Sequence, residues 1–412
     1  MQRKDPPPSR PCIAMAAGGT GGHLFPAEAL ARALLARGER VVIYTDARGA
    51  RYTGALSGID HVVLPARSLA GGLIGKFAAA WTILRAGWLA RRDMRRRGVV
   101  ALAGFGGYPS FAPALAAKSL GLPLLLHEQG LRLSLANRQL LRFADALATS
   151  FAEVAGSERI DPQRITETGN PVRRDILDAR SAFPRIDADG PLRLLVVGGS
   201  QSARVFGEVV PPALLALPDA LRPRLQLSLQ YKGEDTDAIA ARLRSAGIAA
   251  DIRPFFDDMG ARLRDAHLVV TRAGATTIAD LLTVGRPAIF VPIPQGGSQV
   301  EQRTNAETLA RAGAGWCMPE SELSPQSLST RLTDLFSTPE QLVDAAAAAA
   351  GLARPDAAER LADLMQRLAG NAGPHPNPRS APRPAPAAME SNRVRGSGGQ
   401  DVREHTVRGS GA

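Results

Sequence analysis

Cysteine is scarce in this sequence of 412 residues. The two that occur, Cys12 and Cys317, each lie inside an apolar run, which excludes a disulfide framework and indicates a reducing compartment such as the cytoplasm. No uninterrupted apolar run approaches the length that spans a bilayer, and the apolar segment at 12–17 is too short for the core of a signal peptide. The sequence therefore predicts a soluble or peripheral protein.

Excess positive charge is absent from most of the chain, although the formal net charge is +11. Residues 67–97 carry a local charge of +7, and residues from Asn371 onward add +3. The remaining body is nearly neutral, which argues against a general nucleic-acid-binding surface and predicts one localised basic patch.

Length and an apolar fraction of 45% predict two packed domains. Short β-rich runs alternate with helical patterns, which is typical of parallel sheets covered on both faces. We therefore expect an α/β protein with two Rossmann-like, doubly wound parallel-sheet domains facing each other across a cleft. The expected strands lie at 12–17, 41–44, 61–64, 99–102, 124–126, 146–148, 192–197, 225–229, 267–271 and 288–291. The expected divisions are a disordered start at 1–11, a first domain at 12–178, a linker at 179–191, a second domain at 192–350, a C-terminal helix at 351–370 packing back toward the first domain, and a disordered tail at 371–412.

The first expected strand runs into a glycine-rich loop, Gly18-Gly19-Thr20-Gly21-Gly22, which ends at His23 before a helical pattern. Four glycines in five positions allow close approach of backbone N–H groups to a diphosphate, and the helix start adds a positive dipole end. The alternative is a tight turn that binds nothing. The loop lacks the spacing GxGxxG, which weakens a dinucleotide-binding interpretation, and His23 suits proton transfer or charge stabilisation.

Further polar and glycine-rich stretches follow other expected strands, where doubly wound domains bind ligands. Gly199-Ser200 precedes a helix and offers a hydroxyl to a phosphate, or only a helix cap. Gly274 precedes Ala275, Thr276 and Thr277, and Asp280 follows one turn later, where it could accept ribose hydroxyls or complement the helix dipole. The stretches at 104–109, 127–129 and 169–173 complete the set.

Residues 68–97 combine apolar residues at helical spacing with many basic ones. Aromatic residues make up only 5% of the chain, yet two of its three tryptophans lie here. The pattern favours a membrane-surface patch over a buried amphipathic helix with a solvated basic end. The expected patch consists of Leu73, Ile74, Lys76, Phe77, Trp81, Arg85, Trp88, Arg91 and Arg92.

Seven short motifs follow one another along the chain: GGTGGH at 18–23, GFGGYPS at 104–110, HEQ at 127–129, GNPVR at 169–173, GGSQ at 198–201, RAGATT at 272–277 and QRTNA at 302–306. Taken together, these motifs resemble those of the MurG family. The similarity runs from about Ile13 to Leu368 in the same order. It implies the GT-B fold and a peripheral enzyme on the cytoplasmic face of the bacterial plasma membrane. Such an enzyme moves N-acetylglucosamine from UDP-GlcNAc, with inversion, to the muramyl 4-hydroxyl of lipid I (undecaprenyl-pyrophosphoryl-MurNAc-pentapeptide), forming lipid II.

The resemblance also implies roles for individual residues. The first domain would bind the acceptor and an anionic membrane surface, the second would bind UDP-GlcNAc, and neither a cofactor nor a metal is implied. His23 and Glu128 would be the catalytic groups. Contacts to UDP-GlcNAc would come from Thr20, Gly21, Gly22, Gly130, Arg173, Ser200, Phe256, Ala275, Thr276, Thr277, Asp280 and Gln302, with uracil held by Arg173 and the stretch 255–259. The acceptor diphosphate would meet Gly18, Gly19, Thr20, Gly21, Gly22, Gly106, Gly107 and Tyr108.

Three positions depart from the family pattern. Gly130 stands where the family usually has Asn, Ser202 where it has Gly, and Asp280 where it has Glu. An Asn at 130 is expected to add a hydrogen bond to the donor complex. Two other functions stay open: a catalytically weak or silent membrane-bound homologue of the same fold, and a nicotinamide-dependent oxidoreductase with Asp46 on a ribose.

Overall fold

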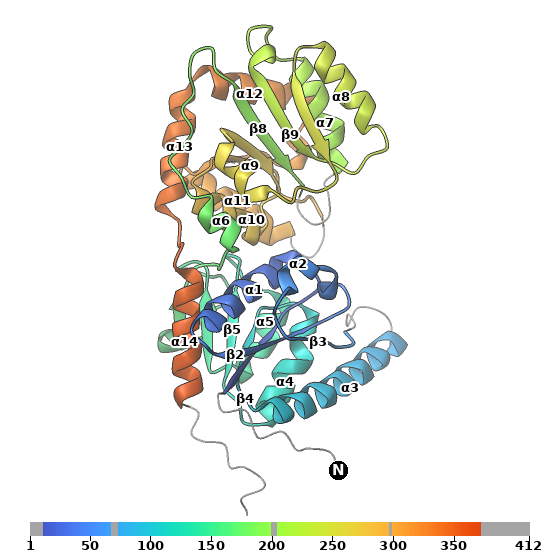
Figure 1. The fold of residues 1–412 in the computed structure, drawn as a ribbon, viewed down its shortest axis with the longest axis vertical. Helices are drawn as coiled ribbons and strands as arrows, with labels where there is room; N and C mark the ends of the chain where they lie inside the picture. The colour runs from blue at the N-terminus through green and yellow to red at the C-terminus, as the bar shows by residue number, and fades with distance from the viewer. Residues whose placement is uncertain (1–10, 67–72, 199–203, 296–298, 372–412) are drawn as a thin grey trace, which may run out of the picture. The chain divides into compact units, whose positions relative to one another are not determined.

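The computed structural model describes residues 11–66, 73–198, 204–295 and 299–371, and for residues 73–79 and Asn371 it describes the backbone only. Two parallel sheets organise this part of the chain (Figure 1). The seven-stranded sheet has the order β3-β2-β1-β4-β5-β6-β7, and the six-stranded sheet has the order β10-β9-β8-β11-β12-β13. In each sheet the order of the strands reverses beside the strand that comes first in the chain, β1 or β8. This is the topology of doubly wound domains. The predicted fold class is confirmed.

The first sheet consists of β1 (Cys12–Ala16), β2 (Arg40–Thr45), β3 (His61–Val63), β4 (Val99–Gly104), β5 (Leu124–Glu128), β6 (Ala146–Thr149) and β7 (Ile165–Glu167). Its helices are α1 (Gly21–Ala36), α2 (Thr53–Leu56), α3 (Leu73–Arg97), α4 (Phe111–Ser119) and α5 (Leu135–Leu140), with a 3₁₀ turn, η2, at Tyr108–Ser110. The next helix along the chain, α6 (Arg174–Asp178), packs against helices of the second sheet.

The second sheet consists of β8 (Leu192–Val197), β9 (Leu225–Gln230), β10 (Ala249–Arg253), β11 (Leu268–Thr271), β12 (Ala288–Phe290) and β13 (Gly315–Cys317). Its helices are α7 (Arg204–Leu215), α8 (Thr236–Ser245), α9 (Met259–Asp265), α10 (Ala275–Val284), α11 (Gln299–Arg311), α12 (Pro325–Ser337) and α13 (Pro339–Gly351), followed by α14 (Ala357–Asn371).

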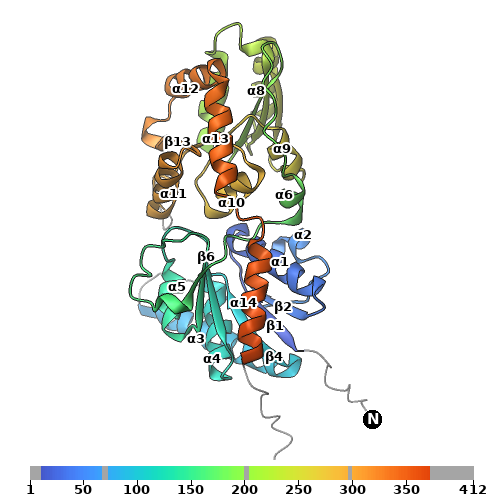
Figure 2. The same cartoon turned by 90° about the vertical axis from the view of Figure 1, so that its left-hand side faces the viewer.

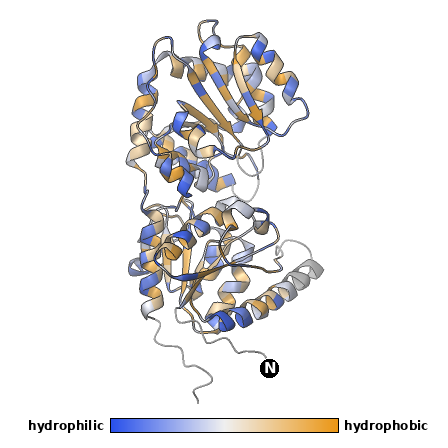
Figure 3. Ribbon diagram, in the orientation of Figure 1, coloured by the Kyte–Doolittle hydropathy of each residue, from blue (hydrophilic) through white to orange (hydrophobic). Residues whose placement is uncertain are grey.

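The central strands are apolar on both faces because each sheet is covered by helices on both sides, and they stand out by their hydropathy in Figure 3. In β1 the alternate residues Ile13 and Met15 pack in one cluster with α1, whereas Cys12 and Ala14 pack in the opposite cluster with α3 and α4. Each sheet therefore has two apolar clusters, and the loops at the carboxyl ends of the strands are left to bind ligands.

The last helix, α14, packs against α1 of the first sheet (Figures 1 and 2). Its apolar residues Leu361 and Met365 are fully buried in the cluster that α1 forms with the sheet. At the rim, Arg37 pairs with Glu359 and Asp363. The chain thus returns to its first half after completing the second sheet.

No helix among the described residues is long and apolar enough to cross a membrane.

Candidate active site

The glycine-rich loop after β1 is held in place by Asp46 at the end of β2. The Asp46 carboxylate accepts hydrogen bonds from the amides of Gly19 and Gly49, both at 2.9 Å, and from Arg48 Nε at 2.9 Å. These donors hold the pKa of Asp46 below its usual range although burial acts in the opposite direction. Asp46 is therefore engaged in shaping the loop, and the ribose contact that the oxidoreductase alternative requires is not supported.

His23 lies in the first turn of α1, with its Nδ1 3.3 Å from the Thr20 hydroxyl. Gly106 and Gly107, after β4, have positive φ angles of 82° and 73° and approach the imidazole so closely that a Cβ at either would lie 3.5–3.6 Å from a ring carbon. Burial and the nearby Arg48 guanidinium lower the pKa of His23, so its imidazole is neutral at pH 7. A neutral imidazole beside a glycine loop can accept a proton.

Ser110 and Phe105 join the loop after β4 to the end of β1, where the glycine-rich loop begins. The Ser110 hydroxyl donates to the carbonyl of Ala16 at 2.8 Å, and Phe105 N donates to the same carbonyl at 2.9 Å. Strands β1 and β4 are neighbours at the point where the strand order reverses, so the loops after them meet at the ligand-binding edge.

Glu128, the other candidate catalytic group, is 2% exposed at the end of β5. One carboxylate oxygen accepts from Ser134 N and Asn137 Nδ2, both at 2.8 Å, and the other from Gly130 N at 3.3 Å. Burial raises the pKa of Glu128, and these donors act to lower it. With both oxygens bonded to its own loop, Glu128 is placed to organise residues 128–137.

His127 and Gln129 serve the same loop. His127 Nε2 lies 3.0 Å from the carbonyl of Gly169, and burial lowers the pKa of this imidazole to about 4. Gln129 Nε2 donates to the carbonyl of Phe105 at 3.0 Å. The HEQ motif thus connects β5 to the neighbouring loops after β4 and β7.

A second helix start faces the glycine loop. Helix α10 begins at Ala275 after Gly274, and the Thr276 hydroxyl donates to the carbonyl of Gly22 at 3.0 Å. Asn170 Nδ2 donates to the carbonyl of Ala275 at 3.4 Å, while its Oδ1 is buried without a partner among the described residues. The loops at 18–22, 169–173 and 272–277 therefore meet, and the positive ends of α1 and α10 point to one region.

Arg173 is the N-cap residue of α6 in this region, and its guanidinium lies 4.5 Å from the centroid of the Phe25 ring. Its Nε is buried without a hydrogen-bond partner in the described structure. Burial raises the pKa of the Asp280 carboxyl, on α10, to about 7, although the nearby Arg173 charge acts to lower it. The Arg173 Nε, which lies 3.8 Å from the Asp175 carboxylate without a hydrogen bond, and the Asp280 carboxyl together suit a polar ligand such as a nucleoside.

Several predicted residues are placed differently from expectation or lie outside the described residues. The Phe256 side chain is 2% exposed and covered by the Arg262 guanidinium at 3.8 Å, so it cannot stack on a uracil; its neighbour Phe255 is exposed. Gln302 Oε1 accepts from Ile293 N at 3.3 Å. Ser200, Ser202 and the side chains of Leu73, Ile74, Lys76 and Phe77 are outside the described residues.

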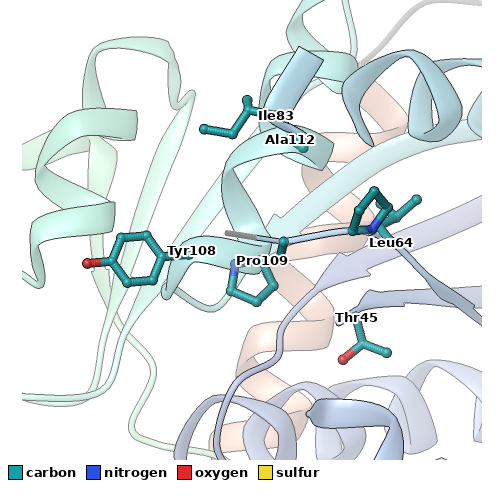
Figure 4. Close-up of a pocket in the computed structure, with 8 residues that line it drawn as sticks. Thr45, Leu64, Ile83, Tyr108, Pro109 and Ala112 are labelled. Carbon is teal, nitrogen blue, oxygen red and sulfur yellow. The ribbon is translucent and has the colours of Figure 1, made fainter. Parts of the chain in front are cut away.

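The exposed face of α3 lies near the loop that carries Tyr108. Trp81, Leu84 and Trp88 are 72%, 67% and 59% exposed. Ile83, on another face of the same helix, lines a small cavity of about 10 Å³ together with Tyr108 and Pro109 (Figure 4). The cavity is too small for a sugar, and it shows only that α3 packs beside η2.

The basic residues of this surface differ in exposure and in their contacts with the rest of the protein. Arg85 and Arg92 are exposed, and Arg92 stacks over Trp88 at 5.7 Å. Arg91 instead donates to the carbonyl and hydroxyl of Ser119 on α4, so its expected place in a membrane patch is not supported.

Sequence reasoning missed Arg48, Asn137, Glu301 and Asn305. Asn305 Nδ2 donates to the carbonyl of Ala273 at 3.0 Å, and its Oδ1 accepts from Leu131 N at 3.4 Å, which joins α11 to loops of both sheets. Its place in the QRTNA motif was the available signal. Among the described residues, no group of three or more His, Cys, Asp or Glu side chains converges as a metal site.

Comparison with known proteins agrees with this geometry. Residues 13–149 match the glycosyltransferase family 28 N-terminal domain, and residues 193–361 match the family 28 C-terminal domain. Two relatives are named UDP-N-acetylglucosamine--N-acetylmuramyl-(pentapeptide) pyrophosphoryl-undecaprenol N-acetylglucosamine transferase. The protein from Rhodospirillum centenum is 45% identical over 87% of this chain and 94% of its own length. The protein from Methylobacterium nodulans is 46% identical over 88% and 98%.

Solved structures show the same similarity. The structure of MurG from Acinetobacter baumannii is 31% identical, covers 87% of this chain and 99% of its own, and superposes with a TM-score of 0.70. The calicheamicin glycosyltransferase CalG4, at 15% identity and a TM-score of 0.63 over 89% of this chain and 100% of its own, shares the fold alone.

Proposed function

Because the chain belongs to the MurG family of N-acetylglucosaminyltransferases, with the GT-B fold, we propose that it moves N-acetylglucosamine from UDP-GlcNAc to lipid I and so makes lipid II for peptidoglycan. The observation that carries the proposal is the meeting of two helix starts beside His23, with Thr276 bonded to Gly22. Two anion-binding helix ends in one place suit a reaction in which donor and acceptor both carry a diphosphate.

The donor would bind at the α10 side of this region. Arg173 and Asn170 each hold a buried polar atom without a hydrogen-bond partner in the described structure, and these would meet the nucleoside. The start of α10 would neutralise the diphosphate, and Asp280 would accept a ribose hydroxyl hydrogen bond in its ionised form. The acceptor diphosphate would lie at the loop of residues 18–22, on amides other than that of Gly19, which donates to Asp46, with Gly106 and Gly107 leaving room beside it.

In the reaction, the acceptor 4-hydroxyl oxygen attacks the anomeric carbon, and the bond from that carbon to the UDP oxygen breaks. UDP leaves with the bonding electron pair, stabilised by the helix starts, and the hydroxyl proton passes to His23. His23 fits this role better than Glu128, whose oxygens already accept three hydrogen bonds from its own loop. Attack opposite the leaving group inverts the α-linked donor to a β-linked product.

The test of this function is UDP release from UDP-GlcNAc with and without a lipid I analogue. Release that depends on the acceptor, with a disaccharide product, is expected. Binding of UDP-GlcNAc without any release in the presence of acceptor would identify a silent homologue instead.

The exposed face of α3 would hold the enzyme at the cytoplasmic face of the membrane, where lipid I would be reached. Replacing Trp81, Leu84 and Trp88 with Ser should lower binding to anionic vesicles at least about 100-fold. The reason is that each large apolar side chain contributes about 1.5–3 kcal/mol when buried, and about 1.4 kcal/mol corresponds to tenfold. Vesicle sedimentation measures the effect.

The melting temperature should stay within a few degrees, since these side chains are exposed. A matched control is Val343→Ser on α13, which is 49% exposed and should not change vesicle binding. A triple variant that binds vesicles like the wild type would contradict the membrane assignment, and one that fails to fold would support a buried helix.

A further inference from the structure

Gly130 follows β5 at a position where a side chain would collide with Glu301. A Cβ built on Gly130 would lie 2.7 Å from Glu301 Oε1 and 3.1 Å from its Cγ and Cδ. The φ of Gly130 is not positive, so its backbone does not require glycine. The carboxyl of Glu301, from the first turn of α11, therefore fills the space above Gly130.

The same glycine connects Glu301 to Glu128. Gly130 N donates to Glu128 Oε1 at 3.3 Å, so the Glu128 carboxylate lies below the backbone that Glu301 covers. One residue further, Leu131 N donates to Asn305 on α11. The loop after β5 thus packs against α11 at two adjacent residues, Gly130 and Leu131. Glu301 is followed on α11 by Gln302.

We propose that Glu301 is a positioning residue of the transfer reaction, whose carboxyl, lying over Gly130, holds the Glu128 loop against α11 and so sets the spacing between the acceptor side and the donor side. The inference rests on the proposed transferase function. It assigns Gly130 the role of making room for Glu301, and it reverses the sequence-based expectation that an Asn at 130 would tighten the donor complex, because the Asn would displace Glu301.

The charges around Glu301 favour its protonated form. Burial and, to a lesser extent, the negative charge of Glu128 together raise the pKa of Glu301 to about 7. On its own helix, Arg303 is turned toward Glu307 and does not neutralise it. Because the folded-state pKa lies above the ordinary value of about 4.3, the stability from this contact is present below that value. It is lost as the pH rises through about 7.

The experiment is a double-mutant cycle on Gly130→Ala and Glu301→Ala. If Gly130→Ala acts by displacing Glu301, each single variant should lower kcat/KM about tenfold, and the double variant should be no worse than either single one. The same cycle measured by urea unfolding at pH 6 tests the contact without relying on catalysis.

The pH profile separates positioning from mere packing. The contribution of Glu301 to wild-type kcat/KM should fall as the pH rises through about 7, and Glu301→Gln, which stays neutral, should lose that contribution. Ionisation of Asp280 for ribose binding would act in the opposite direction over the same pH range. Asp280→Asn is measured in parallel, because Asp280 is another carboxyl with a pKa of about 7. Glu307→Gln is the matched control on the exposed face of α11 and should keep the wild-type profile.

The outcomes are distinct. Coupled effects on both unfolding and transfer support the inference. Additive effects in the unfolding cycle overturn it, as does coupling in unfolding with additive effects on transfer. A wild-type protein that releases no UDP with acceptor refutes the transferase function and with it a positioning role in transfer, whatever the unfolding cycle shows.

Discussion

Replacing His23 with Ala is expected to lower the turnover of sugar transfer by about 10²–10⁴-fold, the range typical of a lost general base. The imidazole lies in the first turn of α1 between the two glycine-rich loops, where a hydroxyl bound beside the acceptor diphosphate would be within reach. The affinity for UDP should stay within about twofold by calorimetry, because the groups proposed to hold the nucleoside, Arg173 and Asp280, are on other elements.

The pH profile gives an independent check on His23. A base must be unprotonated, so transfer should fall as the pH drops through the pKa of His23, which burial and Arg48 hold below 6.5. His61→Ala is the matched control, since His61 is an exposed histidine at the start of β3 and should not change the rate. A loss of UDP affinity in step with the rate would show that His23 binds the donor instead.

Arg286→Met is expected to destabilise the fold by about 3–5 kcal/mol, the scale of breaking a buried, fully bonded charge. Arg286 is 1% exposed between α10 and β12, and its hydrogen-bond acceptors in the described part of the chain include no carboxylate. Its guanidinium donates to the Ser181 hydroxyl and to the carbonyls of Ala182, Leu263, Arg264, Val284 and Gly285.

These acceptors explain the size of the effect. Four of the carbonyls lie at the C-terminal ends of α9 and α10, where the helix dipole favours a cation, and Ser181 and Ala182 belong to the segment between the two sheets. Burial lowers the pKa of Arg286 to about 10, so it stays charged at pH 7. Urea unfolding measures the loss, and Arg244→Met on the exposed face of α8 should show none. A loss below about 1 kcal/mol would mean that water replaces the guanidinium.

Most strands predicted from sequence are largely apolar, although β9 alternates apolar and polar residues. Edge strands were harder: β3 was predicted, but β7, β10 and β13 were missed because a strand at the edge of a sheet is covered less and needs fewer apolar residues. In β10 no residue is fully buried, and Asp251 pairs with Arg253 and Arg262. Their pattern is therefore that of a loop.

The candidate site could be predicted where the residues that form a loop and the residues that act in it belong to one short motif, as in residues 18–23. It was not predictable where function depends on contacts between distant segments. Nothing local to Gly130 indicates that Glu301, far along the chain, occupies the space above it, and Glu128 gives no sign in the sequence that three donors from its own loop surround it. The burial of Phe256 under Arg262 is a tertiary contact of the same kind.

The packing of α14 on α1 has a consequence for biosynthesis. A ribosome makes the first sheet and its helices long before it makes Leu361 and Met365, which complete the apolar cluster beside α1. At about 5–20 residues per second, the roughly 200 residues in between take about 10–40 s to translate. During that time Leu30 and Leu34 of α1 lack part of their apolar cover, so the nascent first half presents a surface on which chaperones can act.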